Sequence, residues 1–128
     1  MKDSILERLS RGPLVFDGAM GTMLYHRGVF INACFDELNV SRPDIVSGIH
    51  ADYVAAGVDV IETNTFGANR VKLRGFGHAE RVAELNRAGV RLAREAAGDD
   101  VYVAGSVGPC LKAGQPWRDA LATELAGV

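Results

Sequence analysis

A chain of 128 residues, 48% of them hydrophobic, is long enough to form one domain around one buried core. Its formal net charge is only −2, with both signs interspersed, which argues against a nucleic-acid-binding surface or attraction to a membrane. No apolar run approaches the ~18–20 residues of a membrane span and the amino terminus lacks an apolar signal core, so we expect a cytoplasmic protein.

The first predicted elements are a helix, an apolar strand and a glycine-containing turn. Asp3 or Ser4 can cap a helix that runs through Leu9. Residues 14–16, LVF, form a brief strand, and the turn DGAMGT follows at residues 17–22. The two glycines of this turn let its backbone bend tightly or come close to a ligand.

A loop and a longer helix are predicted next. Residues 23–27 can form one or two helical turns, and residues 29–39 have no clear period, which is typical of a loop. Ser41 is a candidate cap for a helix with Pro43 in its first turn and Gly57 at its end. The apolar residues of this helix recur on one face, at Ile45, Val46, Ile49, Tyr53 and Ala56.

The most informative stretch is the strand predicted at residues 58–62, VDVIE. So short a run, rich in β-branched residues, is typical of a buried strand of a parallel sheet. It ends in Glu62, Thr63 and Asn64. Because α/β folds meet their ligands at the carboxyl ends of strands, these polar residues indicate a site. The alternative is that Glu62 and Asn64 only cap the next helix or satisfy loop backbone.

The remaining pattern repeats helix and strand. A short helix is predicted at residues 69–74, a longer one at 79–97, and a third buried strand at 101–105, followed by Ser106. A weak helical pattern covers residues 117–125. Strands that start near residues 14, 58 and 101 and alternate with helices predict an α/β fold with a parallel sheet.

Two acidic residues should meet at one edge of this sheet. Asp17 follows the first strand and Glu62 ends the second, and parallel strands place both carboxyl ends on the same side. The pair could share a proton as an acid–base dyad, or both carboxylates could stay ionised and hold an ammonium group. The turn that begins at Gly18 favours the second interpretation, because its free N–H groups could donate hydrogen bonds to a carboxylate. Ammonium plus carboxylate indicates an amino-acid ligand.

The cysteines and histidines give no metal or nucleophile pattern. Cys34 and Cys110 lie far apart in no metal-ligand spacing, and we expect both to be reduced and packed. His26, His50 and His78 are scattered, and His50 is predicted to be a structural residue at the surface or half-buried.

Four segments resemble the amino-terminal part of the homocysteine S-methyltransferase family. They are DGAMGTMLYHRGVFINACFDELNVSRPDIV, IHADYVAAGVDVIETNTFGANRVKL, ELNRAGVRLAREA and VAGSVGP, within residues ~12–110. GVFINACFDELN is most similar to bacterial members that join this module to a methylenetetrahydrofolate reductase, and next to cobalamin-dependent methionine synthases.

This resemblance implies a (β/α)₈ TIM barrel in which zinc activates the homocysteine thiol for attack on a methyl donor. Carried over by position, Asp17 would help to hold the substrate ammonium and the Gly18 turn its carboxylate. Glu62, Thr63 and Asn64 would line the same pocket. These residues would bind rather than make bonds. The donor stays open between a methylated folate, cobalamin and a methylsulfonium or betaine compound.

The family's zinc-binding cysteine motifs, including a GGCCG-like sequence, do not occur here. We therefore expect the zinc ligands in a missing carboxyl-terminal part, and neither Cys34 nor Cys110 is assigned to the metal. A barrel of this class needs about 250 residues and eight strands, and this chain has three predicted strands. Residues 1–128 are accordingly predicted to be an amino-terminal fragment, inactive alone and aggregating or molten.

Two other readings stay open. A complete small flavodoxin-like α/β domain that binds a ligand without catalysis would be a stable monomer that unfolds cooperatively. A hydrolase that uses Asp17 and Glu62 as a carboxylate dyad would show a bell-shaped pH profile without needing a metal.

Overall fold

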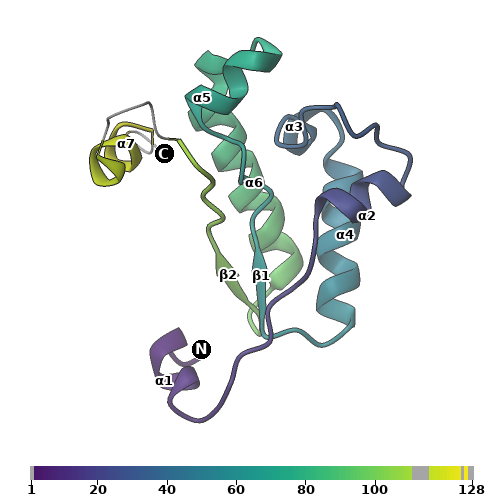
Figure 1. Ribbon diagram of the computed structural model, residues 1–128. Helices are drawn as coiled ribbons and strands as arrows, with labels where there is room; N and C mark the ends of the chain where they lie inside the picture. Colours follow the sequence, from purple (N-terminus) through teal and green to yellow (C-terminus); the bar gives the residue numbers. More distant parts are fainter. Residues whose placement is uncertain (1, 111–115, 125, 127–128) are drawn as a thin grey trace.

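The computed structural model describes residues 2–110, 116–124 and 126. Its elements, in chain order and as labelled in Figure 1, are α1 (Ile5–Leu9), α2 (Gly21–His26), α3 (Leu38–Ser41), α4 (Pro43–Ala55), β1 (Val60–Glu62), α5 (Arg70–Leu73), the 3₁₀ turns η1 (Arg74–Phe76) and η2 (Ala79–Arg81), α6 (Val82–Ala97), β2 (Tyr102–Ala104) and α7 (Trp117–Glu124). The predicted alternation of helices and strands is confirmed. Residue 125 of the last predicted helix lies outside the described residues.

The sheet is parallel, as predicted. β1 pairs with β2 in the register Val60↔Tyr102, Ile61↔Val103 and Glu62↔Ala104. On the other side of β1, the predicted first strand is reduced to one parallel bridge, between Phe16 and Val60. Residues 14–16 do not form a longer strand because they have little to pack against: Val15 is 57% exposed.

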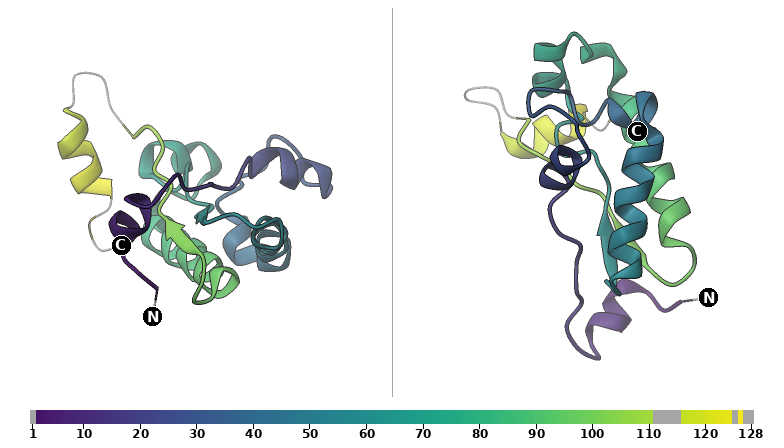
Figure 2. Two further views of the ribbon diagram at one scale, coloured as in Figure 1. Left: turned by 90° about the horizontal axis from the view of Figure 1, so that it is seen from below. Right: turned by 90° about the vertical axis from the view of Figure 1, so that its right-hand side faces the viewer.

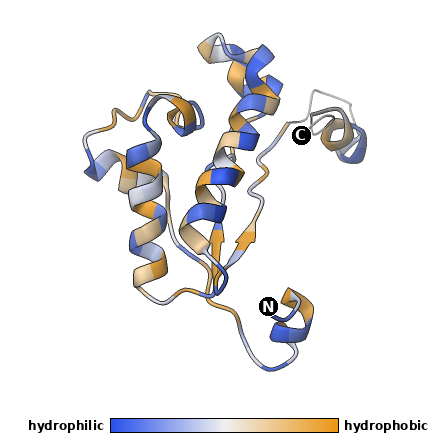
Figure 3. Ribbon diagram, turned by 180° about the vertical axis from the view of Figure 1, so that it is seen from behind, coloured by the Kyte–Doolittle hydropathy of each residue, from blue (hydrophilic) through white to orange (hydrophobic). Residues whose placement is uncertain are grey.

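Both long helices lie on the same face of this sheet (Figures 1 and 2). Both strands carry hydrophobic residues (Figure 3), and Ile61 packs with residues from α6 in one buried cluster. A flavodoxin-like domain carries helices on both faces of its sheet, so this one-sided arrangement favours the barrel prediction.

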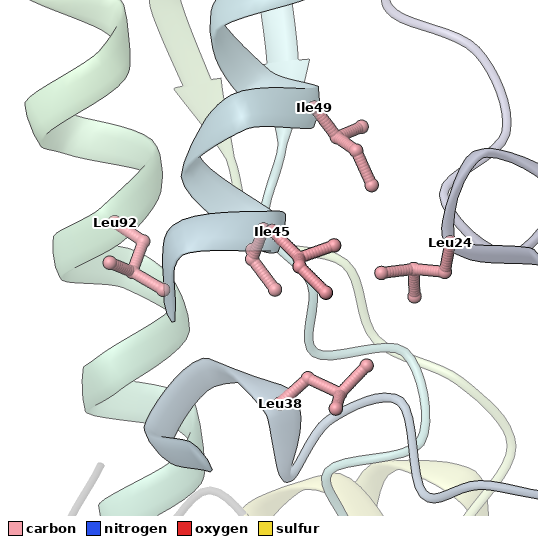
Figure 4. Packing of buried hydrophobic residues seen from close by; sticks show 6 residues of the cluster. Leu24, Leu38, Ile45, Ile49 and Leu92 are labelled. Carbon is pink, nitrogen blue, oxygen red and sulfur yellow. The ribbon is translucent and has the colours of Figure 1, made fainter. Parts of the chain in front are cut away.

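A second buried cluster joins α2, α3, α4 and α6. Its members are aliphatic side chains that approach one another from these four helices (Figure 4): Leu24, Leu38, Ile45, Val46, Ile49 and Leu92. α2 and α3 lie on either side of the loop at residues 27–37, so this cluster anchors both ends of that loop. The core thus fixes the loops that surround the carboxyl ends of the strands.

The predicted helix starts are partly wrong. Ser41 does not cap α4; it ends α3, and its Oγ contacts the Glu37 carboxylate at 2.7 Å. A residue before proline is pushed out of the helical region, so Arg42 takes φ −137° and ψ 57°, and α4 starts at Pro43. Ala56, predicted on the buried face, is exposed. Ser4 caps α1 as predicted, with a capping box to Glu7.

Across the described part of the chain, no helix combines the length and the apolar character that crossing a membrane requires.

Candidate functional site

A cavity of about 560 Å³ opens at the carboxyl ends of the strand segments. All five residues predicted for the site line it: Asp17, Gly18, Glu62, Thr63 and Asn64. They come from the turn after residues 14–16 and from the end of β1 with the turn that follows it. The predicted meeting of these two turns is confirmed, and the ligand that they hold stays a prediction.

Asp17 and Glu62 are adjacent because the sheet pairing continues into the first turn. The Asp17 N–H donates to the Val60 carbonyl at 2.9 Å, and the Glu62 N–H donates to the Asp17 carboxylate, with both oxygens at 3.1 Å. Burial raises the pKa of Asp17, and the negative charge of Glu62 raises it further, against the lowering effect of the Glu62 N–H. A cation between the two carboxyl groups would be stabilised by both.

The turn at Gly18 presents unpaired backbone donors. The N–H groups of Gly18, Ala19 and Met20 have no hydrogen-bond acceptor within the described residues. Tyr53 fixes this turn from α4: its hydroxyl donates to the Ala19 carbonyl at 2.8 Å. A Cβ on Gly18 would lie 3.0 Å from the Tyr53 hydroxyl, so any larger residue at this position would press against Tyr53.

Thr63 and Asn64 have their polar groups engaged within the protein. The Thr63 hydroxyl lies 2.6 Å from that of Thr65 and accepts the Ser106 N–H at 3.0 Å. The Asn64 amide nitrogen donates to the Phe35 carbonyl at 2.8 Å and to Asn39 Oδ1 at 3.0 Å. These side chains tie the end of β1 to the loops on either side of it. The Asn64 amide nitrogen therefore does satisfy loop backbone, which is the alternative role considered from the sequence.

Sequence reasoning missed several residues of the cavity. Asp36 lies in the stretch predicted as a featureless loop, yet it lines the cavity and is only 8% exposed. Lys72, from α5, adds a positive charge to the lining. Phe66 and Phe76 contribute rings that are 60% and 48% exposed. The available signal for Asp36 was a carboxylate directly after the apolar run Ala33–Phe35.

The described residues do not fit a zinc site. No group of three or more His, Cys, Asp or Glu side chains in residues 2–110, 116–124 and 126 could hold a metal ion. Both cysteines are free, as predicted. Cys34 packs against a buried apolar cluster, and burial raises the pKa of its thiol, whereas Cys110 is 5% exposed. A metal-binding thiolate needs the opposite environment.

The exposure predicted for His50 is wrong. Its side chain is fully buried in α4, and neither ring nitrogen has a hydrogen-bond partner within the described residues. The position falls beside Ile49 on the packed side of the helix, so the neighbouring core positions, rather than the polarity of the ring, determine its burial.

Comparison with known proteins places these features in a family. The homocysteine S-methyltransferase family model matches residues 14–125. The chain is 38% identical over 121 residues to methionine synthase of Mycobacterium tuberculosis and 37% identical over 120 residues to that of Mycobacterium leprae. Each alignment covers 84% of this chain and 10% of the relative, so the chain spans about a tenth of the length of these proteins.

The fold is similar to solved structures of the homocysteine methyltransferase MmuM from Escherichia coli. The metallated form matches with a TM-score of 0.69 and 27% identity, over 91% of this chain and 42% of that one. The oxidized form matches with a TM-score of 0.71 and 26% identity, over 97% and 44%. The chain thus corresponds to less than half of those enzymes.

Proposed function

The chain belongs to the homocysteine S-methyltransferase family, and we propose that it contributes the first βα units of a (β/α)₈ barrel that transfers a methyl group to the thiol of homocysteine. The observation that carries this proposal is the pairing of Asp17 with Glu62 beside the free N–H groups of the Gly18 turn. Such a site recognises the two charged ends of an α-amino acid.

The ammonium group of homocysteine would lie between the carboxylates of Asp17 and Glu62. Each carboxylate keeps lone pairs for a charge-assisted hydrogen bond, even though Asp17 already accepts one N–H. The bound cation would also offset the repulsion that raises the pKa of Asp17. Glu62 lies at the exposed end of β1, where a ligand can reach it.

The substrate carboxylate would bind the N–H groups of Gly18 and its neighbours. Several donors that point into one concave turn form a small anion site. Thr63 and Asn64 contribute by holding the surrounding loops in place through the bonds described above. The thiol would then point away from these turns into the rest of the cavity.

Zinc belongs to the chemistry expected of the family, since a metal ionises the thiol, but the described residues of this chain do not fit it. These residues instead bind and orient the substrate. The methyl donor is left open between a folate, a cobalamin and a methylsulfonium or betaine compound.

Ligand titrations followed by NMR test the proposal. Homocysteine is compared with 4-mercaptobutanoate, which lacks the ammonium group, and with 3-mercaptopropylamine, which lacks the carboxylate. We expect the chain to bind homocysteine more tightly than either analogue, and Asp17→Asn and Glu62→Gln to remove the preference over 4-mercaptobutanoate. Glu95→Gln, an exposed change on α6, is the control. Equal binding of all three compounds would contradict the proposed clamp.

A further inference from the structure

Residues 31–36, here called the wall segment, form one side of the cavity through Ile31, Ala33, Phe35 and Asp36. We propose that Asp36 is a positioning residue: with Phe35 it sets the spacing between the two turns that grip the amino-acid end of the ligand. This inference rests on the proposed function, because it concerns the same site.

Asp36 holds the second turn. Its Oδ1 accepts the Gly67 N–H at 3.0 Å, and a Cβ on Gly67 would lie 2.6 Å from Oδ2. The carboxylate therefore lies directly against the backbone of Gly67, and a side chain at this position would displace Oδ2. Among the described residues, no cation forms an ion pair with this buried carboxylate, and burial raises its pKa. The Gly67 N–H is consequently its main polar partner.

Phe35 holds the first turn and the end of β1. Its ring carbon Cε2 would lie 3.2 Å from a Cβ on Gly21, so the ring packs directly on the turn that carries Asp17. The Phe35 carbonyl accepts a hydrogen bond from the Asn64 amide at 2.8 Å. Two consecutive residues of the wall segment thus contact both ligand-binding turns, each at a glycine.

This bridge is independent of the direct bond between Asp17 and Glu62. The direct bond fixes the base of the two turns at the sheet, whereas Asp36 fixes the far end of the second turn, five residues beyond Glu62. Without Asp36, the stretch from Thr65 to Gly67 loses its hydrogen bond to the wall segment. The cavity would then widen on that side, and a ligand that contacts both turns would bind more weakly.

The test uses the 128-residue chain and four variants. Asp36→Ala removes the acceptor, and Asp36→Asn keeps a carbonyl acceptor without the charge. Gly67→Ala creates the clash with Oδ2, and the double variant Asp36→Ala/Gly67→Ala relieves it. Glu95→Ala, an exposed charge on α6, is the charge-matched control. Homocysteine affinity and thermal unfolding are measured for each chain.

We expect Asp36→Ala and Gly67→Ala each to weaken homocysteine binding about tenfold. Asp36→Asn should stay within about twofold, because it keeps the bond to the Gly67 N–H, and such rescue distinguishes positioning from cation binding. In the Asp36→Ala background, Gly67→Ala should cost nothing more, since the two residues are coupled through one contact. Unchanged affinity in Asp36→Ala, or equal costs of Gly67→Ala in both backgrounds, would overturn the inference.

A readout without ligand separates this inference from the proposed function. The Gly67 amide proton shift should follow the ionisation of Asp36, with a midpoint above the ordinary aspartate pKa, and should not do so in Asp36→Asn. If the Gly67 amide shift follows the ionisation of Asp36 but no chain binds homocysteine, the proposed function fails. The contact between Asp36 and Gly67 is then still supported. A Gly67 amide shift that does not follow the ionisation of Asp36, or a spectrum typical of an unfolded chain, would contradict the inference itself.

Discussion

His50 shows how strongly one buried residue can couple stability to pH. Burial alone lowers its pKa from 6.5 to about 4, because neither ring nitrogen has a partner within the described residues that would favour the charged form. The imidazole is therefore neutral in the folded chain and becomes protonated in the unfolded chain below pH 6.5.

The sign of the effect follows from this difference. Between pH 6.5 and about 4 the unfolded state binds more protons at His50, so its contribution to stability is complete above pH 6.5 and is lost as the pH falls toward 4. The loss amounts to at most ~3 kcal/mol. The raised carboxyl pKa values of Asp17 and Asp36 act in the opposite direction and are common to the chain and its His50 variant.

We predict that His50→Leu flattens the pH dependence of unfolding between pH 6.5 and 4.5. Leucine has a similar volume and does not titrate, so the variant should be less sensitive to acid than the original chain. Urea unfolding at several pH values measures this directly. Parallel stability profiles for the two chains would show that His50 does not titrate with the stated difference.

Residue-scale prediction from the sequence succeeded where topology decides position. Asp17 and Glu62 were placed together because parallel strands bring their carboxyl ends to one edge, and the structure joins them by a hydrogen bond. Asp36 was not singled out from the sequence, and the exposure predicted for His50 was wrong. Their burial depends on how a loop and a helix pack against neighbours distant in sequence, which neither periodicity nor residue type encodes.

At the scale of the elements, α6 is held close to the end of β1 by a glycine. A Cβ on Gly89 would lie 2.6 Å from Thr65 Cγ2, 2.8 Å from Asn39 Nδ2 and 3.4 Å from the Asn64 carbonyl oxygen. These neighbours are the buried groups that shape one side of the site. The need for a glycine at this position becomes clear only from the contact with the loop.

We predict that Gly89→Ala destabilises the chain by about 2 kcal/mol, although alanine favours a helix over glycine by ~1 kcal/mol. Gly48→Ala in α4 is the matched control. There a new Cβ would meet only the end of the flexible Arg27 side chain, so that variant should be neutral or slightly stabilised. Thermal unfolding of both variants decides the matter, and an equal response at the two glycines would contradict the close packing of α6.

Element boundaries were predicted less well than element order. The helix before β1 begins at Pro43 rather than after a Ser41 cap, since the residue that precedes proline cannot remain helical. The first strand shrinks to one bridge because, among the described residues, no other strand pairs with its outer side. The first difference arises from local backbone geometry, and the second from the lack of a pairing strand among the described residues. The hydrophobic pattern of the sequence predicts neither of them.

At the scale of the whole molecule, one side of the sheet is closed and the other is open. Side chains between the sheet and α6 are fully buried, including Ile61 and Ala93. By contrast, many large apolar side chains are exposed elsewhere, among them Leu6, Val15, Phe30, Ile31, Phe66 and Trp117. The buried side chains indicate an ordered core, and the exposed apolar side chains favour association between copies of the chain.

We therefore predict a folded chain that self-associates as its concentration rises. The segment at residues 14–16 is an edge of the parallel sheet, Val15 on it is 57% exposed, and a net charge of −2 provides little repulsion between copies. Val15→Lys should shift size-exclusion elution toward the monomer, because a lysine on an edge strand disfavours pairing with another chain. Val90→Lys, at a 40% exposed position on α6, adds the same charge away from the edge and should leave the association unchanged. Elution as a monomer at all concentrations, or an equal response to both lysines, would show that the open sheet edge does not drive association.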